Sequence, residues 1–133
     1  RESGGRYAVG DTVPFVPEVV LRLDLGAKGS LASLGLGKLT GRVGAAVSSL
    51  YRRPLPFAEL GSDVFLVDAV AGARLAGFEL TLEAWNVLNR AWNDGEFVYA
   101  SNFARGSASS QVPTRHVTTG APRAFLLSLA LTI

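Results

Sequence analysis

Residues 124–133, AFLLSLALTI, alternate large apolar side chains with smaller or more polar ones. Successive side chains of a β-strand point to opposite faces, so a period of two predicts a strand with two different faces. One face holds Phe125, Leu127, Leu129, Leu131 and Ile133, and the other holds Ala124, Leu126, Ser128, Ala130 and Thr132. Neither this stretch nor any other approaches the roughly 18 consecutive apolar residues of a transmembrane helix.

Four upstream segments repeat the alternation, and each has one apolar side and one more polar side. The Ala-rich segment from Asp68 to Leu75 also permits a helix, but Gly72 and the alternation favour a strand. The apolar sides are Val19, Leu21, Leu23 and Leu25; Leu39, Val43, Ala45, Val47 and Tyr51; Phe65, Val67, Ala69, Ala71 and Ala73; and Phe78, Leu80, Leu82 and Ala84.

The connections between these segments alternate in length. A tight turn at residues 75–77 and a moderate link at 27–37 would lie at one end of the sheet, together with the C-terminus. Long connections at 10–17, 53–63 and 87–121 would lie at the other end, the last as one long loop. Short turns at one end, long loops at the other and strands of about 8–13 residues are typical of outer-membrane barrels. Tyr51, Phe65, Phe78 and Phe125 lie near the ends of the apolar faces, where such barrels carry aromatic girdles.

The composition agrees with a surface that mostly faces something other than water. Hydrophobic residues make up 48% of the chain and charged residues only 18%, against roughly 25% in soluble domains. The basic residues are scattered and the net charge is only +2, so we expect no nucleic-acid partner. There is no Cys, His116 is the only His, and no acid–base or nucleophile pair stands out. We therefore expect no cofactor, no metal site and no enzyme.

These observations predict an all-β fold, an antiparallel meander of about five strands within a large transmembrane β-barrel. Five strands cannot close a barrel, because every backbone group inside the hydrocarbon must be paired within the protein. The sequence starts at Arg1 and contains no Met, so we expect residues 1–133 to be the C-terminal fragment of a barrel domain with earlier strands upstream. The lipid bilayer and those earlier strands would be its partners.

The last third of the chain carries a resemblance to a known family. Residues 78–92, FELTLEAWNVLNRAW, resemble the penultimate strand of TonB-dependent receptors, and residues 122–127, PRAFLL, resemble the start of their final strand. Residues 10–18, GDTVPFVPE, resemble the extracellular loop that enters the fifth strand from the end. One departure is Ile133, where the family usually has an aromatic residue that the insertion machinery recognises. The motif positions are Asn86, Asn89, Trp92, Pro122, Arg123 and Phe125.

The resemblance implies a barrel of about 22 strands closed by an N-terminal plug domain, in a bacterial outer membrane. Such receptors import a scarce extracellular ligand, a siderophore, cobalamin or a saccharide, with energy relayed by TonB. The plug and the segment that contacts TonB would lie upstream of Arg1.

Two groups of residues are candidates for the functional surfaces. A charge on the lipid side costs about 2–4 kcal/mol for Arg or Lys near the midplane, so we expect the charged strand residues to face the lumen. The lumen-facing candidates are Arg22, Asp24, Arg42, Asp68, Arg74, Glu79 and Glu83. Loops on a rigid scaffold often carry binding residues. The extracellular candidates for ligand contact are Arg90, Trp92, Asp94, Glu96, Tyr99, Arg105 and Arg115.

Two alternatives remain at this point. One is a different outer-membrane barrel, a porin-like channel or an adhesin. The other is a soluble β-sandwich that serves as a binding module, with its apolar faces packed on each other.

Overall fold

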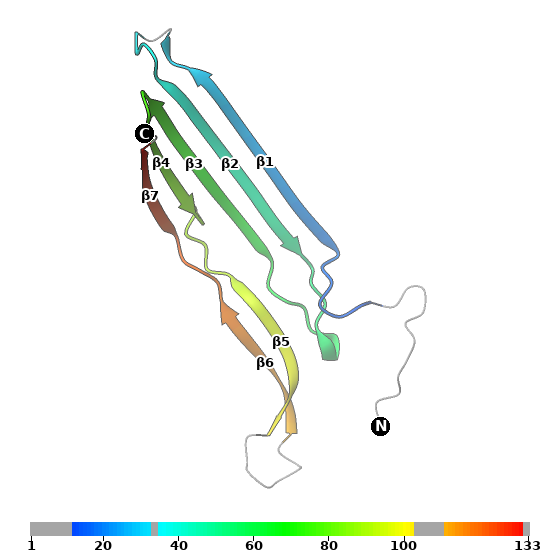
Figure 1. Cartoon of the computed structure of the whole chain (residues 1–133). Coiled ribbons are helices and arrows are strands. Elements are labelled where there is room, and N and C mark those ends of the chain that lie inside the picture. Colours follow the sequence, from blue (N-terminus) through cyan, green and yellow to red (C-terminus); the bar gives the residue numbers. More distant parts are fainter. Residues whose placement is uncertain (1–11, 33–34, 103–110, 132–133) are drawn as a thin grey trace.

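The computed structural model describes residues 12–32, 35–102 and 111–131, and these residues form two antiparallel sheets (Figure 1). The larger sheet has five strands in the order β1-β2-β3-β4-β7. Their bounds are Val19–Ser30 (β1), Thr40–Tyr51 (β2), Val64–Leu75 (β3), Phe78–Trp85 (β4) and Ala124–Leu131 (β7). All five strands predicted from the sequence are therefore confirmed, including the one at Asp68–Leu75 that competed with a helix.

The register confirms that the five apolar sides lie on one face of this sheet. Paired residues of adjacent antiparallel strands lie on the same face. Leu25, Ala45, Ala69, Ala84 and Phe125 form one continuous row across all five strands. Along the strand ranges given above, this face contains no charged residue, and we call it the apolar face.

The opposite face, which we call the polar face, holds every charged residue of the five strands. Gly26, Gly44, Val70, Glu83 and Leu126 form one of its rows. Both faces are open in this chain: on the apolar face Leu25, Leu127 and Leu129 are each 65–66% exposed.

The two ends of the five-stranded sheet differ as the sequence predicts. At the turn end, Ala76 and Gly77 join β3 to β4 with φ angles of 44° and 87°. Positive φ at both central residues is the geometry of a type I′ turn, which matches the twist of the two strands. The link between β1 and β2 is shorter than expected, because β1 continues to Ser30 and Leu31 donates its N–H to the Leu39 carbonyl.

At the loop end, the prediction of one long loop over 87–121 is wrong. This segment contains the strands β5 (Asn93–Asn102) and β6 (Gln111–Thr119), which form a two-stranded hairpin. The hairpin extends the chain beyond the ends of β4 and β7 (Figure 1). β-branched residues such as Val112, Thr114 and Val117 suit strands, but the Ser, Asn and Gly residues nearby obscured that signal.

Most of the buried side chains lie where this hairpin meets the connection between β2 and β3. Leu55, Val64, Glu96 and Val98 are each at most 5% exposed. The short 3-10 helix η2 (Pro56–Ala58) lies beside β5 in this region. The junction at the loop end is therefore the small packed core of the described part of the chain.

The five-stranded sheet is open, because β1 and β7 each have only one neighbour. Within the described ranges, no helix is both long and apolar enough to cross a membrane.

Candidate functional site at the loop end

Three connections come together at the loop end of the sheet. Phe15 donates its backbone N–H to the Pro54 carbonyl at 2.7 Å, and Glu18 donates to the Arg52 carbonyl at 3.2 Å. These bonds join the segment before β1 to the β2–β3 connection. The hairpin then packs on that connection through the side chain of Glu96.

Glu96 is a buried carboxylate whose two oxygens are held by donors from both sides of the junction. Its Oε2 accepts bonds from Arg53 Nη2 at 2.8 Å and from the Ser62 N–H at 2.7 Å. Its Oε1 accepts bonds from Ser62 Oγ at 2.8 Å and from Asn93 Nδ2 at 2.8 Å. The side chain of Glu96 has no exposed surface. We call Arg53, Ser62, Asn93 and Glu96 the Glu96 cluster.

The donors of this cluster decide the charge of the carboxyl group. Burial raises the pKa of Glu96, but the hydrogen bonds from Arg53, Asn93 and Ser62 together outweigh it and lower the pKa from 4.5 to about 2. Glu96 is therefore ionised at any physiological pH, and its chemistry is that of a fixed anion. Such a group holds two segments together and has no proton to donate to a substrate.

The backbone beside the cluster leaves no room for another atom. A Cβ on Gly61 would lie 2.6 Å from Glu96 Oε2 and 3.3 Å from the Arg53 carbonyl. A second arginine, Arg115, also joins the hairpin to the β2–β3 connection. Its Nη2 donates to Glu59 Oε2 at 2.7 Å and to the Leu60 carbonyl at 2.6 Å. Its Nη1 also lies 3.9 Å from Glu96 Oε1. The structure thus brings together two of the predicted loop candidates, Glu96 and Arg115, in a structural role.

Sequence reasoning missed the three partners of Glu96, which are Arg53, Ser62 and Asn93. Ser62 lies 34 residues and Arg53 lies 43 residues from Glu96. No spacing pattern links positions so far apart. The only local signal is the pair Gly61-Ser62 in a long connection.

The residues of the family motif also come together, in a turn built on Asn86. Asn86 Oδ1 accepts the Arg90 N–H at 2.9 Å, and Asn86 Nδ2 donates to the carbonyls of Arg90 and Ala121 at 2.8 and 3.2 Å. Asn86 is 4% exposed and has a φ of 49°, a conformation that asparagine tolerates better than most residues. We call the segment from Asn86 to Arg90 the Asn86 turn.

The Asn86 turn joins the end of β4 to the start of β7. Asn89 Oδ1 accepts the Arg123 N–H at 3.2 Å, and Trp92 Nε1 donates to the Ala121 carbonyl at 3.0 Å. The Trp92 indole packs directly against Gly120. Pro122 lies with these residues beside a hollow at the base of the hairpin. Trp92, a predicted ligand candidate, thus has a structural role here.

The outer surface of the hairpin carries aromatic side chains in two contacts. The Phe15 and Phe97 rings are tilted with centroids 5.9 Å apart, and the Tyr99 and His116 rings are stacked with centroids 4.0 Å apart. Phe97 and Tyr99 are about half exposed, at 51% and 52%. Of the remaining candidates, Asp94 is exposed and Arg105 lies outside the described residues, as does Ile133.

All seven lumen-facing candidates lie on the polar face. Asp24 accepts two bonds from Arg22, each of 2.9 Å. Glu79 lies between Arg42 at 3.3 Å and Arg74 at 3.6 Å, and Arg42 also donates to Thr81 Oγ1 at 2.9 Å. A hollow of about 420 Å³ on this face is lined by Arg22, Asp24, Arg42, Asp68 and Glu83 among others. The face is thus a charged surface whose ion pairs are still open to water.

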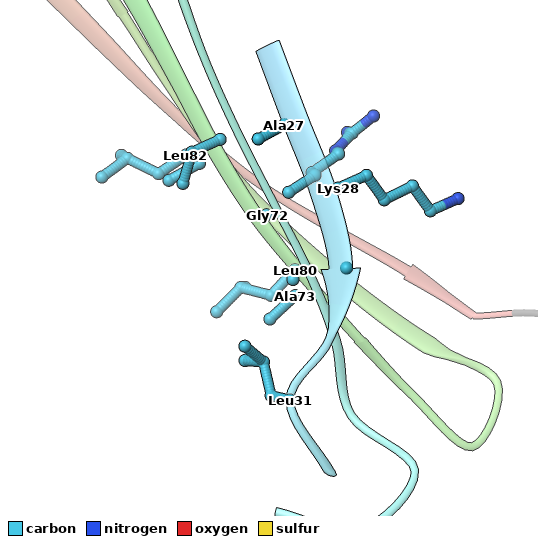
Figure 2. A pocket seen from close by; sticks show the side chains of 12 residues that line it. Ala27, Lys28, Leu31, Gly72, Ala73, Leu80 and Leu82 are labelled. Atoms are coloured by element: carbon cyan, nitrogen blue, oxygen red, sulfur yellow. The ribbon is translucent and has the colours of Figure 1, made fainter. Parts of the chain in front are cut away.

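The apolar face has a hollow of about 590 Å³ near the turn end (Figure 2). Its floor is formed by small residues such as Ala27, Gly41 and Ala73, and Leu31, Leu80 and Leu82 stand around it. Figure 2 shows Leu31, Leu80 and Leu82 on one side of the strands and Lys28 on the other. The surface of the hollow is mostly apolar, although Lys28 and Arg42 also border it.

Among the residues that the structure describes, no group of three or more His, Cys, Asp or Glu side chains is placed to bind a metal ion.

A comparison of the chain with protein-family models finds no match, and comparisons with curated proteins and with solved structures find none either. The resemblance to TonB-dependent receptors therefore depends on the quoted residues alone.

Proposed function

We propose that this chain forms the C-terminal part of the wall of a transmembrane β-barrel in a bacterial outer membrane. The observation that carries the proposal is the separation of charge between the two faces of the five-stranded sheet. The apolar face is uncharged over all five strands, whereas eight charged residues lie on the polar face, Lys28 and the seven lumen-facing candidates. In a barrel wall the first face contacts lipid and the second faces the lumen.

The open edges of the sheet support the same proposal. Unpaired N–H and C=O groups inside hydrocarbon cost several kcal/mol each, so β1 and β7 need further strands to close the wall. Strand β7 would pair with the first strand of the barrel, and β1 would pair with the strand that precedes it.

The aromatic residues and the connections favour a barrel wall over a soluble β-sandwich. Tyr51, Phe65 and Phe125 lie at the loop end of the apolar face, and Phe78 lies at the turn end. Aromatic residues at both ends of an otherwise aliphatic face are typical of the two membrane interfaces. A sandwich core has no reason to place them so, or to put every long connection at one end.

Within this class, we infer a TonB-dependent receptor that imports a scarce ligand of the siderophore, cobalamin or saccharide class, with a transport role and no catalysis. Support comes from the Asn86 turn, where Asn89 accepts the Arg123 N–H, and Asn86 and Trp92 both donate to the Ala121 carbonyl. The plug, TonB and the extracellular ligand would be its partners. The hairpin, with its exposed aromatic rings, would stand on the ligand side.

Spin labels on two adjacent leucines test the wall directly. Residues 1–133 contain no Cys, so with any cysteine outside them replaced by Ser, single labels at Leu126→Cys and Leu127→Cys in the complete gene product report on opposite faces. The label at 127 should collide freely with oxygen and poorly with a water-soluble nickel chelate, and the label at 126 should show the reverse. If neither reagent reaches position 127, the face is packed in a sandwich and the proposal is wrong.

Planar bilayer recordings separate a plugged receptor from a porin-like channel. The complete gene product should show no stable open conductance, whereas a steady ohmic channel would support the alternative.

Replacement of residues 93–119 by a short Gly-Ser linker should lower uptake of the imported ligand, with ferric chelates, cobalamin and labelled oligosaccharides as the probes. Unchanged growth of the deletion strain on every one of these probes as a limiting nutrient would contradict the receptor.

A further inference from the structure

Two arginines at the loop end lie over aromatic rings of the apolar face. The Arg90 guanidinium carbon is 5.7 Å from the centroid of the Phe65 ring, and that of Arg123 is 5.8 Å from the centroid of the Phe125 ring. Both distances are within the range of cation–π attraction. Phe65 and Phe125 belong to the apolar face by register, at its loop end. Two positive charges therefore border a face that otherwise carries none.

The Asn86 turn fixes the backbone of both arginines. Asn86 Oδ1 accepts the Arg90 N–H at 2.9 Å, and Asn89 Oδ1 accepts the Arg123 N–H at 3.2 Å. The two side chains thus start from anchored positions, and each rests on a ring. The ring contact restricts each guanidinium and so lowers the entropy that it loses when it binds a ligand.

Neither arginine is neutralised by a carboxylate. Across the described residues, the salt bridges of arginine involve Arg22, Arg42, Arg52, Arg53, Arg74 and Arg115. Arg90 and Arg123 have no acidic group within 4.0 Å in this part of the chain, and both are exposed. Their charge is available to an anion that approaches from the side of the apolar face.

We infer that Arg90 and Arg123 each bind the phosphate of an anionic lipid headgroup in the leaflet at the loop end. The inference rests on the proposed function, because it needs the apolar face to contact a bilayer. An arginine presents a planar fork of donors that matches a phosphate, and the rings beneath keep the fork at the level of the interface. The acyl chains of the same lipid would lie along the apolar face below Phe65 and Phe125.

Lipid retention by the complete gene product tests this inference. The protein is inserted into vesicles of equal parts phosphatidylcholine and phosphatidylglycerol, extracted gently, and its bound lipids are counted by native mass spectrometry. We expect the wild type to retain phosphatidylglycerol in preference. One charge near an anionic surface corresponds to about a fivefold change in binding. The double variant Arg90→Gln/Arg123→Gln should therefore lose most of the preference, and Arg90→Lys/Arg123→Lys should keep part of it.

The control is Arg22→Gln, which removes one positive charge near the same end but on the polar face. It should retain phosphatidylglycerol like the wild type. An unchanged preference in the double glutamine variant, or an equal loss in the control, would overturn the inference. Insertion itself is measured separately, by protease protection in pure phosphatidylcholine. A wild type that is not protected there refutes the proposed barrel wall as well, whereas a protected protein without lipid preference refutes only this inference.

Discussion

Ser62 holds both oxygens of the Glu96 carboxylate, with its backbone N–H 2.7 Å from Oε2 and its hydroxyl 2.8 Å from Oε1. One residue of the β2–β3 connection thus fixes the orientation of a side chain from β5. The hairpin is thereby tied to the rest of the loop end by a buried charge, and its position depends on that charge.

Glu96→Gln should release the hairpin from the connection. Arg53 is largely buried and would lose its counter-charge, and removal of one partner of such a pair costs about 3–5 kcal/mol. At about 1.36 kcal/mol per tenfold change, amide hydrogen exchange in β5 and β6 should be faster by a factor of at least about a hundred. The control Glu59→Gln breaks the half-exposed pair with Arg115 and should change exchange by less than about tenfold. Equal effects of the two variants would contradict a special role for Glu96.

Acid should release the hairpin over a defined pH window. The folded pKa of Glu96 is depressed to about 2 from 4.5, so its stabilisation is fully present above pH 4.5 and is lost as the pH falls towards about 2. Spin labels at Leu60→Cys and Ala100→Cys would report the distance between connection and hairpin across this range. The distance should widen below pH 4.5 in the wild type. In the Glu96→Gln variant this pH-dependent widening should be absent. The same widening over the same pH range in that variant would show that Glu96 is not its cause.

Gly61→Ala should have an effect similar to that of Glu96→Gln. The added Cβ would lie 2.6 Å from Glu96 Oε2, so either the carboxylate or the connection must move. We expect a loss of about 1–3 kcal/mol in hairpin docking, measured by hydrogen exchange. Gly29→Ala is the control, because a Cβ there meets no atom within 4 Å. Hydrogen-exchange rates like those of the wild type in Gly61→Ala would contradict this prediction and show that the Glu96 cluster accommodates the added Cβ.

Asn86→Ala should loosen the joint between β4 and β7. The substitution removes three side-chain hydrogen bonds from a residue that is 4% exposed and has a positive φ. The Arg90 N–H and carbonyl lose their partner, at about 1–3 kcal/mol each for groups shielded from water, whereas the Ala121 carbonyl keeps its bond from Trp92. Thermal unfolding of the complete protein, followed by heat-modifiable mobility, should show a clearly lower Tm. Asn89→Ala removes the bond to Arg123 from a more exposed residue, so its Tm should fall less.

Leu127→Arg and Leu126→Arg should differ sharply in assembly. Position 127 is on the apolar face, where an arginine near the bilayer midplane costs about 2–4 kcal/mol. Position 126 pairs with Glu83 on the polar face, where a cation gains a partner. The yield of folded protein in the outer membrane should fall only for Leu127→Arg. A comparable loss for both variants would show that the two faces are not as different as proposed.

The strands could be predicted from sequence because the alternation is a local property. In residues 125–131 the large apolar side chains recur at every second position, although Leu126 also lies on the polar face, and the pairing partners Leu80 and Leu129 show the same period on separate strands. The face of each strand followed from this period, whereas the register between strands comes from the structure. The turn at Ala76–Gly77 could be predicted for the same reason, because its signal lies in adjacent residues.

The junction at the loop end could not be predicted in this way. Glu96 was identified as a charged loop residue open to ligand, and its polarity gave no hint of burial. Its environment is made by Ser62 and Arg53 from a distant connection, and a single sequence carries no signal for such a pairing. The Asn86 turn could be predicted in part. The family resemblance identified its residues, but it did not predict the hydrogen bonds that they make.

The strict alternation across all five strands limits how this chain can change its length. A single inserted residue within β3 would rotate the rest of that strand by half a turn and carry Asp68 or Arg74 from one face to the other. Natural variants of this sequence should therefore lengthen or shorten these strands in steps of two. Odd-numbered changes should be confined to the connections, and the segment around Ser62 should resist even those.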